Sequence, residues 1–390
     1  MDNNLIYFDH ASTSPLSKNV LSVINNSYLK YWGNVSSTYK FGIDCALELE
    51  RIRNKIALIF NAEQEDIIFT SGSTESISLV FSQIADNCQP QSITISSIEH
   101  NATNIAVNKL KKRGWAIKEW PVDNEGIVRI EKFKDYINNK TKLVSIIWGQ
   151  SEIGTLQPIQ KIGKLCIKEN VLFHIDATQI ISNGIFNWKN LNCDLLSLSA
   201  HKFGGPKGIG ILLTNEKSRK YISNSDISKS HEYSIRAGTQ ALPLISGMLQ
   251  ALINIKGKIL YSEEILYFKN NNLNILTDYL IEKFKNNNRI QITGSLNQRL
   301  PNHLSFILSN KNFLPIEAYK IINYMSDNNI AISSGSACSS SSNEPSKVLG
   351  ELNIDKNKLL SNIRISFGIE NNINEVDKFY GLILECIDIF

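Results

Sequence analysis

Residues 171–179 read VLFHIDATQ, an unbroken apolar run that ends in a carboxylate. From about residue 65 onward, similar runs recur, each short and rich in isoleucine, leucine or valine. The others are IIFT (67–70), ITIS (93–96), LVSII (143–147), LLSLS (195–199) and IGILL (209–213). Continuous apolar runs are typical of strands buried on both faces of a sheet. Amphipathic helical patterns lie between several of them, so the sequence predicts an α/β fold with a mostly parallel sheet covered by helices.

The pattern changes near Ser246, where a long stretch reads as one or two helices. Short strand-like runs, RIQITG (289–294) and NHLSFIL (302–308), then alternate with helices to the end of the chain. This change predicts a second, smaller α+β domain. We expect a large domain over residues 16–255 and a small domain formed by residues 1–15 and 256–390.

The composition is that of an ordinary globular protein, with 390 residues, 42% hydrophobic and 20% charged. A net charge of +4 is too small to predict a nucleic acid or an anionic membrane as partner. The first residues show no basic region followed by a long apolar run, so we expect neither a signal peptide nor a membrane span. The six cysteines form no Cys-x-x-Cys pair and the six histidines show no metal-binding spacing. We therefore expect a reduced, cytoplasmic protein without disulfides or a metal site.

Ligands of open α/β sheets bind beyond the carboxyl ends of the strands, where this sequence places several polar groups. SGSTES (71–76) joins a strand to a helical run, so the amides that begin the helix form an anion site, although STES is also an ordinary helix cap. Asp176 ends an apolar strand, where a charge needs a partner. Lys202 follows another strand, together with Ser199 and His201, and a buried lysine suits a Schiff base.

Each of these residues has an ordinary structural alternative, such as a helix cap for Asp176 or a core histidine for His201 or His100. Taken together, an anion site, an aromatic ring, a buried carboxylate and a lysine form the set that pyridoxal phosphate (PLP) requires. The aspartate keeps the pyridine nitrogen protonated, and the lysine bonds to the aldehyde. Asp176 and Lys202 are 26 positions apart (202 − 176), which fits two neighbouring strands joined by one crossover.

Ten stretches, in order along nearly the whole chain, resemble the cysteine desulfurases of the NifS/IscS type, a class-V aminotransferase group of the fold-type-I PLP enzymes. They are IYFDHASTSP (6–15), GNVSSTYKFG (33–42), FTSGSTES (69–76), EHNA (99–102), SEIGTLQPI (151–159), HIDATQ (174–179), SLSAHKFGGPKGIG (197–210), RAGTQ (236–240), SSGSACSSSSNEPSKVL (333–349) and SNIRISFG (361–368). The resemblance implies a large domain with a seven-stranded, mostly parallel sheet, and the small domain described above.

The resemblance also implies roles around the cofactor. Lys202 bonds to the PLP aldehyde and acts as the base, Asp176 pairs with the pyridine nitrogen, and Gln179 contacts the phenolic oxygen. His100 stacks on the ring and takes part in proton transfer. The residues that hold the phosphate are Ser73, Thr74, Ser199, His201 and, from the other subunit of a homodimer, Thr239.

The substrate is then L-cysteine, whose carboxylate Arg364 and Asn34 bind. Cys338 lies in SSGSACSSSS (333–342), where small polar residues predict a mobile loop over about 333–345. The resemblance makes this thiol the nucleophile that receives the sulfur as a persulfide. L-alanine is released, and the sulfur passes to an acceptor protein that serves iron–sulfur cluster assembly, tRNA thiolation or a dedicated pathway.

The sequence departs from the family pattern at several positions. Ser151 replaces an asparagine that meets the PLP phenolic oxygen, Val35 a proline, Tyr39 a histidine and His10 a tyrosine, and residues 228–230 lack the usual glycines. Two alternatives stay open at this point. One is another class-V PLP enzyme, such as a selenocysteine or cysteine lyase or an aminotransferase, and the other is a degenerate homologue that acts as a scaffold.

Overall fold

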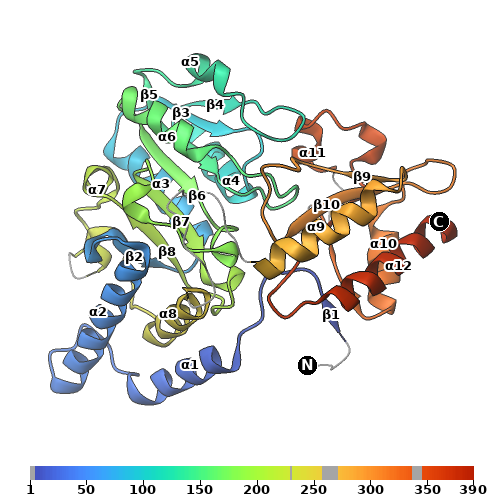
Figure 1. Ribbon diagram of the computed structural model, residues 1–390. Coiled ribbons are helices and arrows are strands. Elements are labelled where there is room, and N and C mark those ends of the chain that lie inside the picture. The colour runs from blue at the N-terminus through green and yellow to red at the C-terminus, as the bar shows by residue number, and fades with distance from the viewer. Residues whose placement is uncertain (1–4, 229–230, 257–270, 336–344) are drawn as a thin grey trace.

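The computed structural model describes residues 5–228, 231–256, 271–335 and 345–390 (Figure 1). Its larger sheet has seven strands, and only β8 runs antiparallel to its neighbours. In spatial order the strands are β2 (Ile67–Thr70), β8 (Gly210–Thr214), β7 (Leu195–Ser199), β6 (Leu172–Asp176), β5 (Thr141–Ile147), β3 (Ser92–Ser96) and β4 (Ala116–Trp120). The predicted α/β class with a mostly parallel sheet is therefore confirmed.

Helices cover both faces of this sheet. One face packs against α1 (Lys18–Lys30), α2 (Lys40–Phe60), α6 (Ile159–Lys168) and α8 (Leu242–Lys256). The other face packs against α3 (Ser73–Asn87), α4 (Asn101–Lys111) and α7 (Glu216–Ile222), while the short α5 (Phe133–Tyr136) lies beside β4. Among the helices of the described ranges, none combines the length and the apolar character needed to span a bilayer.

Strand β6 shows why its sequence is an unbroken apolar run. Phe173 and Ile175 join the core on one face of the sheet, and Leu172 joins the core on the other. His174 is fully buried, and its two ring nitrogens lie 2.8 and 2.9 Å from the hydroxyls of Ser145 and Ser197 on the neighbouring strands. Burial lowers the pKa of His174 to about 3, so this side chain is a neutral, hydrogen-bonded part of the core.

A second unit follows along the chain, with an antiparallel sheet in the order β12 (Ser333–Ser334), β13 (Asn362–Ser366), β10 (His303–Leu308) and β9 (Ile290–Ile292). Strand β1 (Ile6–Tyr7) pairs in parallel with β11 (Ile330–Ala331), which brings the N-terminal segment into this unit. Its helices are α9 (Asn271–Lys285), α10 (Ala318–Asp327) and α12 (Ile373–Ile389), whereas the short α11 (Lys347–Glu351) packs Val348 and Leu349 into the core of the larger unit.

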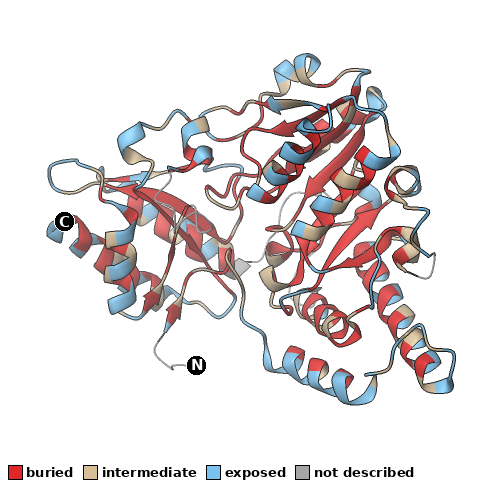
Figure 2. Ribbon diagram, turned by 180° about the vertical axis from the view of Figure 1, so that it is seen from behind, coloured by how far each residue is buried: buried red, intermediate tan, exposed pale blue. Residues whose placement is uncertain are grey.

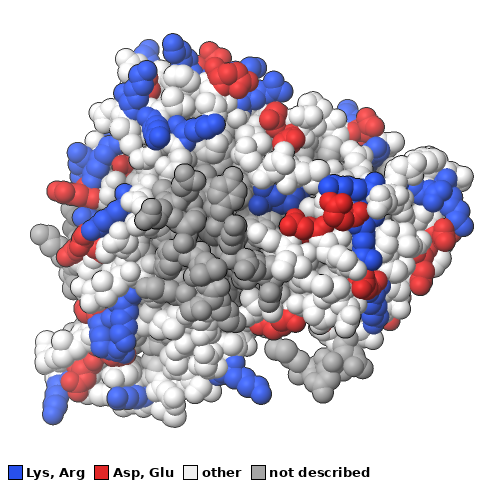
Figure 3. Space-filling model, viewed as in Figure 1, with Lys and Arg blue, Asp and Glu red and all other residues white. Residues whose placement is uncertain are grey.

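This unit has its own hydrophobic core, in which Phe8 from the N-terminal segment packs against Phe367 and Phe379. Figure 2 shows buried strands in both sheets, whereas the outward faces of many helices are exposed. We propose that the two units are the domains predicted from the sequence, because separate cores and the joining of β1 to β11 support that division. On the face drawn in Figure 3, basic and acidic side chains are interspersed.

The small core should depend on Phe306, which is fully buried between Phe284 (ring centroids 4.8 Å apart) and Phe379 (6.4 Å). We expect Phe306→Ala to lower the free energy of unfolding by about 3–5 kcal/mol, because the cavity removes these contacts. Urea unfolding followed by circular dichroism measures this loss. Leu314→Ala, at an exposed position in the same unit, should change stability by less than about 0.5 kcal/mol. Equal losses in the two variants would contradict this description of the core.

Candidate active site

The carboxyl ends of neighbouring strands bring the predicted site residues together. Strand β6 ends at Asp176, and the adjacent, parallel β7 ends at Ser199, three residues before Lys202. Strand β3 leads to His100, and β5 leads to Ser151. Parallel strands end at the same edge of a sheet, so the fold gathers these side chains at one edge.

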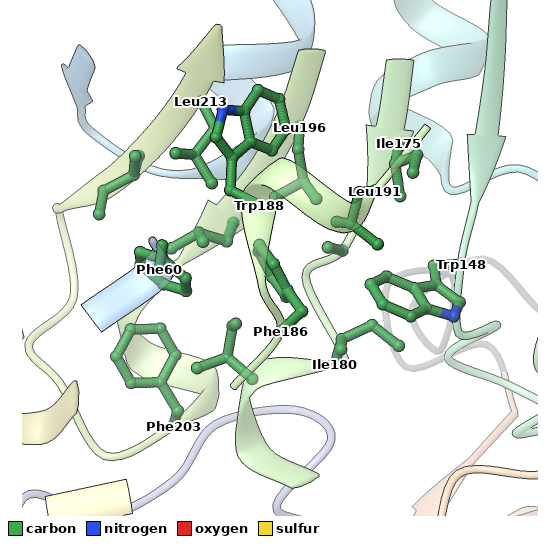
Figure 4. Packing of buried hydrophobic residues seen from close by; sticks show 14 of the residues in the cluster. Phe60, Trp148, Ile175, Ile180, Phe186, Trp188, Leu191, Leu196, Phe203 and Leu213 are labelled. Atoms are coloured by element: carbon green, nitrogen blue, oxygen red, sulfur yellow. The ribbon is translucent and has the colours of Figure 1, made fainter. Parts of the chain in front are cut away.

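The residues that directly follow Lys202 and Gln179 are anchored in the hydrophobic core, as Figure 4 shows. Phe203 comes directly after Lys202, and Ile180 comes directly after Gln179. Both are buried in the cluster that also contains Trp148 and Phe186, whose ring centroids lie 5.9 Å apart. The site side chains therefore project from a backbone that packing holds in place.

Asp176 is a buried carboxylate, with 3% of its surface exposed. Its Oδ1 accepts hydrogen bonds from the backbone N–H of Thr178, at 3.0 Å, and from the Thr178 hydroxyl. The same hydroxyl lies 2.6 Å from the Ser73 hydroxyl, so a chain of hydrogen bonds links Asp176 to the start of α3. Both of these hydrogen-bond donors, within the part of the chain that the structure describes, are neutral, a setting that suits a protonated pyridine nitrogen.

Lys202 lies in the short 3-10 turn Ala200–Lys202 and is half-buried. Its Nζ donates hydrogen bonds to the carbonyl oxygens of Ala11 and Ser12, both at 2.8 Å. Gln179 Nε2 donates to the same Ala11 carbonyl at 2.9 Å. The predicted lysine and glutamine therefore meet at one point of the N-terminal segment.

The start of α3 lies where the sequence predicts an anion site. Gly72 is its N-cap, with φ 148°, and supplies no side-chain cap to the first amides of the helix. A Cβ atom on Gly72 would lie 3.2 Å from Ser199 Oγ, so glycine permits the close approach of the turn to β7. Ser73 is buried beside this turn, whereas Thr74 is exposed. The free amides and the positive end of the helix dipole suit a phosphate.

His201 and His100 flank this arrangement. Burial lowers the pKa of His201 to about 4, with further contributions from Lys202 and Lys207, so the ring is neutral at pH 7. Its Nδ1 lies 3.3 Å from Thr13 Oγ1. His100 is the N-cap of α4, where its Nδ1 accepts a hydrogen bond from Ala102 N at 3.1 Å.

Arg364 is buried on β13, with 3% of its surface exposed, and reaches the site from the smaller sheet. Its Nη2 donates to Asp9 Oδ1 at 2.8 Å and to Ser12 Oγ at 2.7 Å, and Nη1 donates to the Ser151 carbonyl at 3.2 Å. Within the described part of the chain, Nε has no hydrogen-bond partner. The guanidinium is thus held in place and keeps a free donor, which suits a substrate carboxylate.

Three residues of the site carried no clear signal in the sequence: Asp9, Glu99 and His303. Asp9 pairs with Arg364, and His303 Nε2 lies 3.0 Å from the Ser151 carbonyl, which fixes Ser151 through its backbone. Glu99 accepts hydrogen bonds from Ser96 Oγ at 2.5 Å and from Ile147 N at 2.8 Å. Burial raises the pKa of Glu99 to about 8. The sequence signal that could have pointed to Glu99 is its position in EHNA (99–102), between an apolar strand and the cap of a helix.

Two predicted residues lie apart from this cluster in the single chain. Asn34 is exposed in the loop between α1 and α2, where its side chain accepts a local hydrogen bond from Ser36 N. Thr239 is exposed directly after Gly238. The roles implied for these two residues stay predictions.

Cys338 lies outside the described residues. The described chain on both sides of it belongs to the site. Ser333 on β12 pairs with Arg364, and Ser346 donates a hydrogen bond to Glu152 at 2.6 Å.

Four features of this site fit PLP and an amino acid substrate: the buried carboxylate, the lysine, the helix start without a side-chain cap and the arginine with a free donor. Together with the fold, they define a PLP-dependent enzyme of fold type I.

The aminotransferase class-V family matches residues 6–379. A cysteine desulfurase IscS from Dictyoglomus turgidum is 35% identical over 367 residues, covering 93% of this chain and 90% of the relative. The IscS of Rickettsia prowazekii is 34% identical over 392 residues, covering 98% and 91%.

A solved NifS-like protein superimposes with a TM-score of 0.86 at 29% identity, covering 98% of this chain and 99% of that one. The chain belongs to the class-V aminotransferase family and, within it, to the cysteine desulfurases. Members of this group depend on PLP, which agrees with the residues gathered at the strand ends.

The close packing around the start of α3 predicts that PLP binding is sensitive to a substitution of Gly210. A Cβ atom there would lie 2.6 Å from the Cα of Gly72 and would push β8 away from the helix start. We expect Gly210→Ala to weaken PLP binding at least about tenfold, measured by the absorbance of the bound cofactor. Gly381→Ala, in α12 with open space around it, should bind PLP normally and gain up to about 1 kcal/mol of stability. Unchanged PLP affinity in Gly210→Ala would contradict this geometry.

Proposed function

We propose that this protein removes the sulfur atom from L-cysteine, leaves L-alanine and carries the sulfur as a persulfide on Cys338. The observation that carries the proposal is the meeting of Lys202, Asp176 and Arg364 at the carboxyl edge of the large sheet. Its curated relatives are named cysteine desulfurases, which supports the same reaction.

When bound, PLP supplies an electron sink that acidifies the Cα–H bond of the amino acid and loosens its Cβ–S bond. Asp176 would hold the proton at the pyridine nitrogen, because the hydrogen bonds that its buried carboxylate accepts among the described residues come from neutral Thr178 groups. Lys202 Nζ takes the Cα proton from its place beside the Ala11 and Ser12 carbonyls. Arg364 binds the substrate carboxylate through its free Nε, while Asp9 and Ser12 fix the rest of the fork.

The remaining predicted residues complete the site in this proposal. Ser73, Thr74, Ser199 and His201 would hold the phosphate, and Gln179 and Ser151 would contact the phenolic oxygen. His100 would stack on the ring and take part in proton transfer, and Asn34 would assist Arg364.

Cys338 acts as a thiolate that attacks the substrate sulfur. A new S–S bond forms, and the electron pair of the Cβ–S bond passes to the substrate carbon skeleton, which is protonated and leaves as alanine. In sum, L-cysteine and the enzyme thiol give L-alanine and the enzyme persulfide. The positions of Ser333 and Ser346 support this role, because both flanks of the segment lie at the site.

Two variants separate the open alternatives. Cys338→Ser should keep the PLP absorbance but lose at least about 100-fold in alanine formation from cysteine, because its hydroxyl is a poor nucleophile at pH 7. Borohydride reduction of the PLP-loaded wild-type protein should leave a pyridoxyl adduct on Lys202, as measured by mass spectrometry, and Lys202→Ala should show no such adduct anywhere on the chain and form no alanine. Cys88→Ser, at a half-buried cysteine at the end of α3, serves as the control and should behave like wild type.

Full activity in Cys338→Ser would favour a simple lyase. Wild-type protein that takes up no PLP would favour a scaffold without catalysis.

A homodimer belongs to the proposal, because α1 and α2 present an apolar surface that the single chain leaves exposed. Leu29 and Trp32 at the end of α1 are 79% and 71% exposed. Tyr39, Ile43 and Leu47 follow at a spacing of four residues, which puts them on one face of α2. All five are exposed, and a second copy covering this surface would bury them. The same dimer would bring Thr239 to the phosphate of the partner.

We expect Trp32→Glu to convert the dimer into a monomer, because a charge cannot be buried there without a partner. Light scattering after size-exclusion chromatography measures the mass. Tyr319→Glu, at an exposed aromatic residue of the small sheet unit, is the matched control and should stay dimeric. A wild-type protein that elutes as a monomer would exclude the homodimer.

The sulfur passes to an acceptor protein, as the activity requires, and we propose an iron–sulfur scaffold, a tRNA-thiolation protein or a dedicated carrier. The cytoplasmic location and the absence of a nucleic-acid partner stay predictions from the sequence.

A further inference from the structure

The segment that leads to Thr239 begins with an unusual backbone. Glu232, Tyr233 and Ser234 have φ values of 44°, 54° and 64°, so three successive residues other than glycine lie in the left-handed region. Each such residue is strained and persists only where its surroundings hold it. Glu232 is also 2% exposed, which makes it a buried carboxylate in a surface turn.

Four hydrogen bonds hold the Glu232 carboxylate. Arg53, from α2, donates to both oxygens, at 2.8 and 2.9 Å. The backbone N–H of Phe69 donates to Oε2 at 2.8 Å, and Gln240 Nε2 donates to Oε1 at 3.1 Å. Burial by itself would lower the pKa of Arg53, but the paired carboxylate outweighs it and raises that pKa, so the arginine stays charged.

The pair completes the open edge of the large sheet. Strand β2 is the first strand in the sheet order and, among the described strands, pairs only with β8. On its outer side, the Ile67 carbonyl accepts from Arg53 Nη1 at 2.7 Å, and the Phe69 N–H donates to Glu232. The two side chains thus take the place of a neighbouring strand for the segment that leads into the phosphate cradle, Ser71–Gly72–Ser73.

A second tether joins the same two segments. Arg236 Nε lies 3.1 Å from Glu75 Oε1, and Glu75 Oε2 accepts a hydrogen bond from Ser71 N. Residues 232–240 are therefore fastened to the cradle at both Glu232 and Arg236. Thr239 lies between Arg236 and Gln240, so its position depends on the same contacts.

We propose that Glu232 is a positioning residue that couples two phosphate sites: the cradle of its own chain, through Phe69, and the site of the second protomer, through Gln240 and Thr239. The coupling rests on the homodimer proposed above. Glu232 touches neither the cofactor nor the substrate and acts through the backbone of β2 and the Thr239 segment. Its loss should weaken phosphate binding and leave the reaction of Lys202 with an aldehyde unchanged.

The test compares PLP with pyridoxal, which has the same ring and aldehyde but no phosphate. In Glu232→Gln we expect the dissociation constant of PLP to rise about tenfold or more, while that of pyridoxal changes less than about twofold. Both are measured from absorbance titrations of the cofactor-free full chain. Glu282→Gln breaks the exposed Lys285–Glu282 pair on α9 and should leave both constants unchanged. Equal weakening of both ligands, or an unchanged PLP constant, would overturn the proposal.

Glu232→Gln removes the buried counter-charge of Arg53 and leaves the more exposed Glu50, 3.2 Å from Arg53 Nε, as a remaining ion-pair partner, so a second variant guards against a folding failure. Arg53→Met combined with Glu232→Gln removes both charges, and we expect the same loss for PLP alone. If both proteins fold and bind PLP as wild type does, Glu232 has no positioning role.

Hybrid dimers test the coupling between subunits. A dimer of one wild-type and one Glu232→Gln protomer should lose PLP faster than wild type from both sites, whereas a hybrid with Thr239→Ala should lose it faster from one site only. If the Glu232→Gln hybrid loses PLP faster from one site only, the coupling between subunits is wrong, while the effect of Glu232 on the cradle of its own chain stands. A wild-type monomer by light scattering overturns the homodimer and the coupling together, and the PLP and pyridoxal titrations then still test the effect of Glu232 on its own cradle.

Discussion

The active site depends on the way one short N-terminal segment holds two cations that come from different sheets. Asp9 and Ser12 fix the guanidinium of Arg364, and the carbonyls of Ala11 and Ser12 receive Lys202 Nζ. The segment is anchored on one side by β1, which pairs with β11, and on the other by Ser14, whose hydroxyl donates to the Lys202 carbonyl at 2.9 Å. The distance between the base and the carboxylate-binding group is thereby set by a single stretch of backbone.

Part of this arrangement could be predicted because it follows from local rules. Asp176 and Lys202 are each placed by the end of an apolar strand, and parallel strands end at one edge, so their proximity was implied by the sequence pattern. The pairing of Asp9 with Arg364 joins residues 355 positions apart, and no pattern of neighbouring residues encodes it. The same holds for Glu232, whose partners Arg53 and Phe69 lie on other elements. Contacts of this kind depend on how the finished elements pack.

The departures from the family pattern also differ in how much they change the structure, because the packing around each position differs. Ser151 replaces an asparagine, but its backbone carbonyl is fixed by Arg364 and His303, so the turn keeps its place and only the side-chain contact changes. Tyr39 lies on the exposed surface of α1 and α2, where its effect depends on what covers that surface. At these two positions, the effect of the substitution on the site depends more on whether the surrounding backbone is fixed than on the chemical type of the new side chain.

Two buried arginines show how a structural ion pair differs from a binding group. Arg53 uses both ends of its fork on Glu232, gives another hydrogen bond to the Ile67 carbonyl and lies 4.5 Å from the Phe69 ring, so its charge is balanced and its donors are directed inward. Arg364 forms a hydrogen-bonded ion pair with Asp9 through one nitrogen and keeps Nε free of partners among the described residues. A buried charge that is incompletely paired is costly unless a further anion completes it. The unequal pairing of the two arginines therefore points to Arg364 as the group that binds a carboxylate and to Arg53 as part of the frame.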